Sequence, residues 1–212
     1  MKHLALPLLL AATLAAGAAH ADAVTLPQAR SQFLAATAGD TAARDAAIES
    51  FARLAAEQPG HPVYLAYQGA ALALKGRDAK QPWEKMKYAE QGADLVEKAV
   101  ALLGPEHDKP LADGNPESIE TRAVAASSLL ALPEFLHRGA AGKRALQGAL
   151  DSPLLEQASA STRASVYAAA ARVAGNERRG ADEAAWLKKI VALPATPAQR
   201  ERAQARLKEL GL

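Results

Sequence analysis

Apolar side chains recur every three or four positions along most of the chain, in stretches that clusters of Gly, Pro, Asn and Asp separate. This spacing gives a helix one apolar side, and Gly and Pro commonly mark where helices end. No run of alternating β-branched residues indicates a strand. The pattern predicts an all-α chain with nine helices, over residues 26–38, 41–57, 63–75, 92–104, 116–131, 140–150, 161–174, 180–193 and 197–210.

Residues with known preferences for helix ends sharpen some of these boundaries. Asp40 or Thr41 can cap the second helix, and Thr196 followed by a proline predicts the start of the last one. Gly76 is expected to end the third helix, because glycine tolerates the left-handed conformation that is common just after a helix. The last helix has one apolar and one polar face, which suits a helix that caps the end of an array.

Two neighbouring stretches have a spacing that is more specific than amphipathicity. The residues that carry it are Ala47, Phe51, Leu54 and Pro59, followed by Leu65, Gly69 and Leu72. They resemble the second helix of one tetratricopeptide repeat (TPR) and the first helix of the next, in a family of 34-residue helix–turn–helix units. Weaker copies of the second-helix spacing begin at Gly92 and Asp182. In this pattern small residues stand where paired helices cross, and large ones fill the space beside them.

The resemblance implies an all-α fold of helical-hairpin repeats, a TPR-like α-solenoid with a C-terminal capping helix. It also implies a single domain over residues 24–212, with a concave groove that holds a protein or peptide partner. A helical bundle without repeats, in which the same spacing arises by coincidence, is the alternative.

The first residues have the composition of an export signal. Lys2 gives a positive start, residues 4–16 are almost entirely apolar, and small-x-small motifs follow. We expect residues 1–21 to be a signal peptide, with the cut after Ala21 or Ala23. The apolar run is shorter than the about 20 residues that a membrane-spanning helix needs, although an uncleaved anchor is the alternative. The expectation is therefore the Sec route, a periplasmic or secreted location, and no stable membrane anchor after cleavage.

Composition and charge narrow the classes of partner and site. The chain has no cysteine, which excludes disulfides, cysteine metal sites and a lipid-attached cysteine. Without Lys2 the chain has 24 basic and 23 acidic side chains, a net charge of +1. Such a balance gives no reason to expect a nucleic-acid partner. Alanine fills 54 of 212 positions, and its high helix propensity and small side chain favour closely stacked helices.

The candidate partner-binding residues come from three stretches of the chain, residues 64–68, 75–88 and 117–122. Residues 75–88 combine cations with Trp83 and Tyr88; a tryptophan flanked by cations can hold an anionic or aromatic group. An arginine there can grip a carboxylate with two hydrogen bonds. The residues expected near the groove are Tyr64, Tyr67, Gln68, Arg77, Trp83, Lys87, Glu120 and Arg122.

Each of these residues also has a structural interpretation. Trp83 can fill the space left by a longer turn, and Arg77 can pair with Asp78 or Glu84. Glu120 can stabilise the start of its helix through the helix dipole. Residues 75–88 also resemble a segment of exported bacterial TPR-like proteins, a resemblance that implies no activity.

No stretch of the sequence has the arrangement of a catalytic or metal site. The serines lack the glycine-framed elbow of hydrolases, and no glycine-rich phosphate loop is present. His61, His107 and His137 are too far apart in sequence to place two ligands on one helical face. We expect no enzyme activity, no cofactor and no metal.

The functional expectation is a non-catalytic scaffold or adaptor that binds a protein or peptide partner in its groove, in an envelope or transport complex. The alternative is a protein that binds a small anionic molecule at the turn over residues 77–88, where Arg77 and Tyr88 would form the mouth of a pocket.

Overall fold

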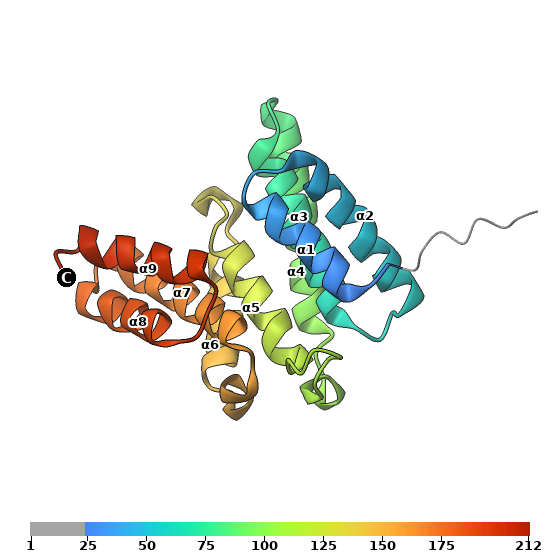
Figure 1. Ribbon diagram of the computed structural model, residues 1–212. Coiled ribbons are helices and arrows are strands. Elements are labelled where there is room, and N and C mark those ends of the chain that lie inside the picture. The colour runs from blue at the N-terminus through green and yellow to red at the C-terminus, as the bar shows by residue number, and fades with distance from the viewer. Residues whose placement is uncertain (1–23) are drawn as a thin grey trace, which may run out of the picture.

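The computed structural model describes residues 24–212, so the predicted signal peptide lies outside the described residues. Over this range the chain is all-α, with nine α-helices, three short 3-10 helices and no β-strand (Figure 1). The α-helices are α1 (Leu26–Thr37), α2 (Thr41–Glu57), α3 (Pro62–Asp78), α4 (Pro82–Ala101), α5 (Glu117–Leu129), α6 (Gly139–Leu150), α7 (Ala160–Asn176), α8 (Gly180–Ala192) and α9 (Pro197–Glu209). The 3-10 helices are η1 (Pro105–Asp108), η2 (Glu134–Leu136) and η3 (Pro153–Gln157). The predicted all-α class and the predicted number of helices are confirmed for this part of the chain.

Two predicted boundaries between α3 and α4 are wrong. Gly76 lies inside α3, which continues to Asp78, and α4 begins at Pro82, well before Gly92. Proline is favoured at the first position of a helix because it has no N–H to satisfy there. Gly76 instead faces α4, where an added Cβ would lie 2.9 Å from the carbonyl oxygen of Lys85. Residues 76–78 and 82–91, which the sequence places outside both helices, thus extend α3 and α4.

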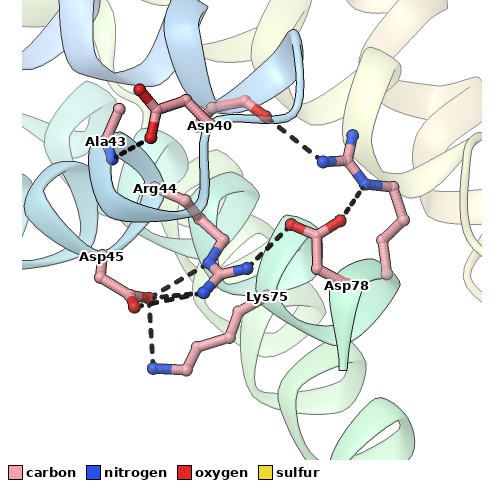
Figure 2. Close-up of polar contacts among 8 residues, drawn as sticks. Asp40, Ala43, Arg44, Asp45, Lys75 and Asp78 are labelled. Atoms are coloured by element: carbon pink, nitrogen blue, oxygen red, sulfur yellow. Dashed lines mark hydrogen bonds and ion pairs between the residues drawn. The ribbon is translucent and has the colours of Figure 1, made fainter. Parts of the chain in front are cut away.

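Two helix starts follow the sequence closely. Asp40, not Thr41, caps α2, since its Oδ1 accepts a hydrogen bond of 2.9 Å from the Ala43 N–H (Figure 2). Thr196 caps α9 in a reciprocal arrangement with Gln199, in which each side chain accepts a hydrogen bond from the other residue's N–H. Both caps satisfy backbone donors that the first turn of a helix leaves without an intrahelical partner.

The helices pack in a regular order along the chain. Each odd-numbered helix contacts the next odd-numbered one, from α1 through α3, α5 and α7 to α9. Each even-numbered helix, α2, α4, α6 and α8, contacts the two odd-numbered helices on either side of it in the sequence. The odd-numbered helices therefore form a continuous row, with α1 and α2 at one end of the molecule and α8 and α9 at the other (Figure 1).

The closest helix approach is between α3 and α4. An added Cβ on Gly69 would lie 2.5 Å from the carbonyl oxygen of Gly92, and one on Gly92 would lie 2.5 Å from the carbonyl oxygen of Gly69. Glycine is the residue that permits such an approach of two backbones. Gly69, which the repeat spacing marks as a small residue, thus lies at a helix crossing.

The segment between α4 and α5, predicted to be a polar loop, is held against α1 and the start of α3. Leu111 is buried in the apolar core that includes Ala29 of α1 and Tyr64 of α3. His107 is also buried; its Nδ1 accepts a hydrogen bond from the Gly104 N–H, so its Nε2 donates to the carbonyl oxygen of Gly60 at 3.1 Å. This segment therefore packs in the same core as Tyr64, which the sequence places near an open groove.

Candidate functional site

Three of the predicted groove residues lie close together, two of them buried and Tyr67 half-buried. Tyr64 is 5% exposed and Glu120 is 3% exposed. The Tyr67 hydroxyl donates a hydrogen bond of 2.7 Å to Glu120 Oε1, and its ring stacks on Phe51 with the ring centres 4.7 Å apart. Arg30 Nη2 lies 2.5 Å from the same Glu120 oxygen. The sequence predicts Tyr64, Tyr67 and Glu120 beside an open groove. In the structure, side chains of α1, α2 and α5 contact Tyr67 instead.

Burial controls the protonation of this cluster. Burial raises the pKa of Glu120 above its ordinary value, and the neighbouring Arg30 cation opposes that rise. Burial also raises the pKa of Tyr67 well above its ordinary value, and the Glu120 charge adds to the effect. Arg30 forms a further ion pair with Asp113 of the segment between α4 and α5. The cluster therefore joins α1, α3 and α5 to one another.

Glu117 caps a helix that is distant in the sequence. Its Oε1 accepts a hydrogen bond of 3.3 Å from the Val63 N–H in the first turn of α3, and its Oε2 lies 2.9 Å from His61 Nδ1. A carboxylate at that position also interacts favourably with the positive end of the helix dipole. His61 itself makes no side-chain cap, so Glu117 supplies what the local sequence lacks.

We expect Glu117→Ala to lower the free energy of unfolding by about 2 kcal/mol, because the buried Val63 N–H loses its acceptor and α3 loses a favourable charge. Urea denaturation of both chains measures the difference. Glu90→Ala, at an exposed position of α4, is the control and should change stability by less than about 0.5 kcal/mol. An equally small effect of Glu117→Ala would contradict the capping role.

Arg77 belongs to a network of ion pairs at the ends of α1, α2 and α3. Its Nε donates to Asp78 at 2.7 Å, and its Nη2 donates to the carbonyl oxygen of Ala36 at 3.3 Å. Arg44 binds the other oxygen of Asp78 and also binds Asp45 (Figure 2). The hydrogen bond from Arg77 is the largest influence that lowers the pKa of Asp78. The structure thus shows the pairing with Asp78 that was the structural interpretation of Arg77.

The remaining residues of the 75–88 stretch are on the surface. Trp83 is 68% exposed, so the expectation that it fills a gap between helices is wrong. Lys87 is exposed, and its ammonium group and that of Lys75 lie 5.6 Å and 5.2 Å from the centre of the Tyr88 ring. This end of the α3–α4 hairpin presents aromatic and cationic groups.

The eight predicted residues therefore do not form one site. Tyr64 and Glu120 are buried and Tyr67 is half-buried, whereas Arg77, Trp83 and Lys87 lie at the outer end of the α3–α4 hairpin. Gln68 is half-buried on α3, and Arg122 lines a cavity formed by α4, α5 and α6.

An open cavity of about 570 Å³ lies at the other end of the row, between α7 and α9, with α8 contributing apolar side chains. Polar, charged and apolar residues line it. The polar ones include Ser127, Ser165, Asn176 and Gln199, the charged ones are Arg172, Arg202, Arg206 and Glu183, and the apolar ones include Ala168, Leu187 and Ile190. Arg206 is bound by Glu183 at 2.7 Å and by Glu209 at 2.8 Å. Arg172 and Arg202 are exposed and have no carboxylate partner within residues 24–212. Two uncompensated guanidinium groups thus stand beside an apolar floor.

The cavity leaves no local signal in the sequence, for a physical reason. The small residues of α7 and the arginines of α9 are visible in the sequence, but both stretches are equally consistent with an ordinary packed and solvated helix. The cavity exists because α7 and α9 touch only slightly while α8 contacts both, and no local pattern encodes that spacing.

Two features are absent from residues 24–212. No group of three or more His, Cys, Asp or Glu side chains in this range is arranged to hold a metal ion. None of the helices described is both long and apolar enough to cross a membrane.

Within residues 24–212, a polar cluster joins α1, α3 and α5, and an open, arginine-lined cavity lies between α7 and α9. Comparison of the chain with protein-family models, with curated protein sequences and with solved structures gives no match.

Proposed function

We propose that this chain is a non-catalytic, TPR-like scaffold or adaptor that binds an extended acidic segment of a partner protein in the groove between α7 and α9. The observation that carries the proposal is the open cavity with Arg172 and Arg202 uncompensated beside an apolar floor. The composition of residues 1–21 supports a periplasmic or secreted location, and hence a partner in an envelope or transport complex.

The order of helix contacts supports a repeat scaffold. In an array of stacked helical hairpins each unit contacts its neighbours, and one face of the array presents a continuous surface. The row from α1 to α9 has this property, and each even-numbered helix contacts two members of it. The glycine crossing of α3 and α4 agrees with the small-residue positions of the repeat pattern.

The chemistry of the groove supports an acidic segment. Arginine is well suited to carboxylates, because its planar guanidinium group can form two parallel hydrogen bonds to them. Ala168, Leu187 and Ile190 provide apolar contact for side chains of the same segment. The cavity volume lies within the about 300–1,000 Å³ typical of ligand sites, which is room for a few side chains of a peptide.

A small-molecule site at the turn over residues 77–88 has less support. Arg77 already binds Asp78 and the carbonyl oxygen of Ala36, so its Nε and one Nη2 donor are engaged. Trp83 is exposed and does not form the wall of a pocket.

The experiment is a selection of displayed random peptides on the immobilised full-length chain. We expect enrichment of peptides with Asp and Glu beside apolar residues. Arg172→Glu/Arg202→Glu should weaken binding of the selected peptides by about tenfold or more, because each charge-assisted hydrogen bond contributes about 1.5–3 kcal/mol. Fluorescence anisotropy measures the dissociation constants.

The matched control is Arg53→Glu/Arg200→Glu, which makes the same change of charge at two exposed positions outside the groove. It should change the dissociation constants by less than about twofold, since screened surface charges contribute little to affinity. Peptides without acidic enrichment, or equal binding by the groove variant and the wild type, would remove the basis of the proposal.

A further inference from the structure

A second cavity, of about 580 Å³, lies between α4 and α6, with α5 contributing to its lining. Three cations from three different helices surround it: Lys98 of α4, Arg122 of α5 and Arg144 of α6. Val100 and Leu129 give it an apolar wall. This cavity involves neither α7 nor α9, and it is separate from the groove described above.

Arg122 is held in place without being neutralised. It is half-buried, and its side chain lies along α6 at Gly148, where an added Cβ would be 3.1 Å from its Nε. Its one hydrogen bond within residues 24–212 is long, 3.5 Å from Nη1 to the carbonyl oxygen of Ser118. No carboxylate in the described part of the chain pairs with it. The position of the side chain is therefore set by packing, and most of its donors remain available.

The other arginines with little exposure are all neutralised. Arg30 pairs with Glu120, Arg44 with Asp78, Arg138 with Glu97, and Arg163 with Glu156. A guanidinium group that is partly removed from water gains most from an anionic partner. Among the partly or fully buried arginines of residues 24–212, Arg122 stands apart, because the chain itself supplies no such anion.

The balance of charge around the cavity favours an anion from outside. Lys98 and Arg144 are exposed, and neither forms an ion pair within the described residues. Glu97 is the one carboxylate in the lining, and Arg138 holds it at 3.0 Å. The lining therefore has more positive than negative charge, and the three cations lie next to apolar side chains.

We propose that this cavity binds a small anion with an apolar body, of the class of a carboxylate or phosphate monoester on an aliphatic chain or ring. Arg122 binds two oxygens of the anionic group, Lys98 and Arg144 add charge at the rim, and the apolar body packs on Val100 and Leu129. The inference does not depend on the groove between α7 and α9.

The experiment is an NMR titration of the 15N-labelled full-length chain with octanoate and, separately, with octyl phosphate, both below their aggregation concentrations. We expect saturable shifts of the backbone amides of residues 97–101, 122–129 and 141–145. The ratio of the two dissociation constants identifies the preferred anionic group. Octanol, which has the same apolar body and no charge, should bind at least about tenfold more weakly.

Variants separate a designed site from general attraction to a basic surface. Arg122→Gln should weaken the binding of both anions by about tenfold or more. Arg122→Lys keeps the charge and loses the planar guanidinium group, and should give a smaller loss of affinity. Arg202→Gln, in the other cavity, should bind as the wild type does. Amide spectra of each variant verify the fold.

Three results would overturn the inference: no saturable shifts, shifts confined to α7–α9, or equal affinity of Arg122→Gln and the wild type. The last two would show binding without a role for Arg122.

Discussion

Arg30→Met is expected to lower the free energy of unfolding by about 3 kcal/mol. The substitution introduces an apolar, unbranched side chain that replaces the aliphatic stem of Arg30. It leaves the Glu120 carboxylate, which is 3% exposed, without its cation. Removing one partner of a buried ion pair costs about 3–5 kcal/mol, because the remaining charge stays uncompensated. Arg30 retains 15% of its side-chain exposure, which places the expected loss at the lower end of that range. Chemical denaturation near pH 7.5 provides the measurement.

The loss should depend on pH in a definite direction. Burial raises the pKa of Glu120 in the folded protein, so the folded state holds this proton more tightly than the unfolded state does. The stability from this group is complete below the ordinary glutamate pKa and declines as pH rises through the raised value. Without Arg30 the pKa rises further, so the decline extends to higher pH. The deficit of the variant should therefore be smaller near pH 5 than near pH 8.

The double variant Arg30→Met/Glu120→Gln is the control for this mechanism. Replacing both members removes the uncompensated charge, and we expect recovery of about half of the lost free energy or more. A deficit that is the same at both pH values, with no recovery in the double variant, would show that Arg30 acts through the packing of its aliphatic stem.

Gly69→Ala is expected to destabilise the protein by about 2 kcal/mol, although alanine is the better helix former by about 1 kcal/mol. The new methyl group would lie 2.5 Å from the Gly92 carbonyl oxygen and 2.8 Å from Val96 Cγ2. A backbone atom cannot rotate away as a side chain can, so α3 and α4 must separate. Overpacking of this kind typically costs about 1–3 kcal/mol and occasionally more, and a backbone clash belongs at the upper end.

Gly180→Ala makes the same change in a helix without the contact. An added Cβ at Gly180, in the first turn of α8, meets no atom within 4 Å. This variant should gain about 0.5 kcal/mol. Thermal unfolding of the two variants should give shifts of opposite sign. A higher melting temperature in both variants would mean that α3 and α4 can separate enough to accommodate one methyl group at little cost.

The local features of the fold were predictable from the sequence because they depend on neighbouring residues. The all-α class follows from apolar spacing, and the caps at Asp40 and Thr196 follow from side chains that bond to the backbone three residues on. The prediction that Gly76 ends α3 was wrong because it used neighbouring residues where a contact with another helix decides. A glycine near the end of an apolar stretch is consistent both with a helix end and with a close helix contact, and only the position of α4 decides between them.

The site was not predictable in the same way because it depends on contacts between distant residues. Tyr67 meets Glu120, Glu117 caps α3 at Val63, and Arg30 joins α1 to α5. Each contact requires the path of the segment between α4 and α5, which a polar and proline-containing sequence does not reveal. The charge of Arg172 and Arg202 was visible, but the absence of partners for them is a property of the packed helices.

The pairing of Arg30 with Glu120 makes the two ends of this array unequal. In a simple stack, a terminal helix can detach and reattach while the remainder stays folded. At the N-terminal end, α1 cannot leave without abandoning a buried carboxylate in α5 and an ion pair with Asp113. At the C-terminal end, α9 is held by α8 and lightly by α7. Fraying is therefore easier beside the groove of α7 and α9, the end that we propose receives the partner.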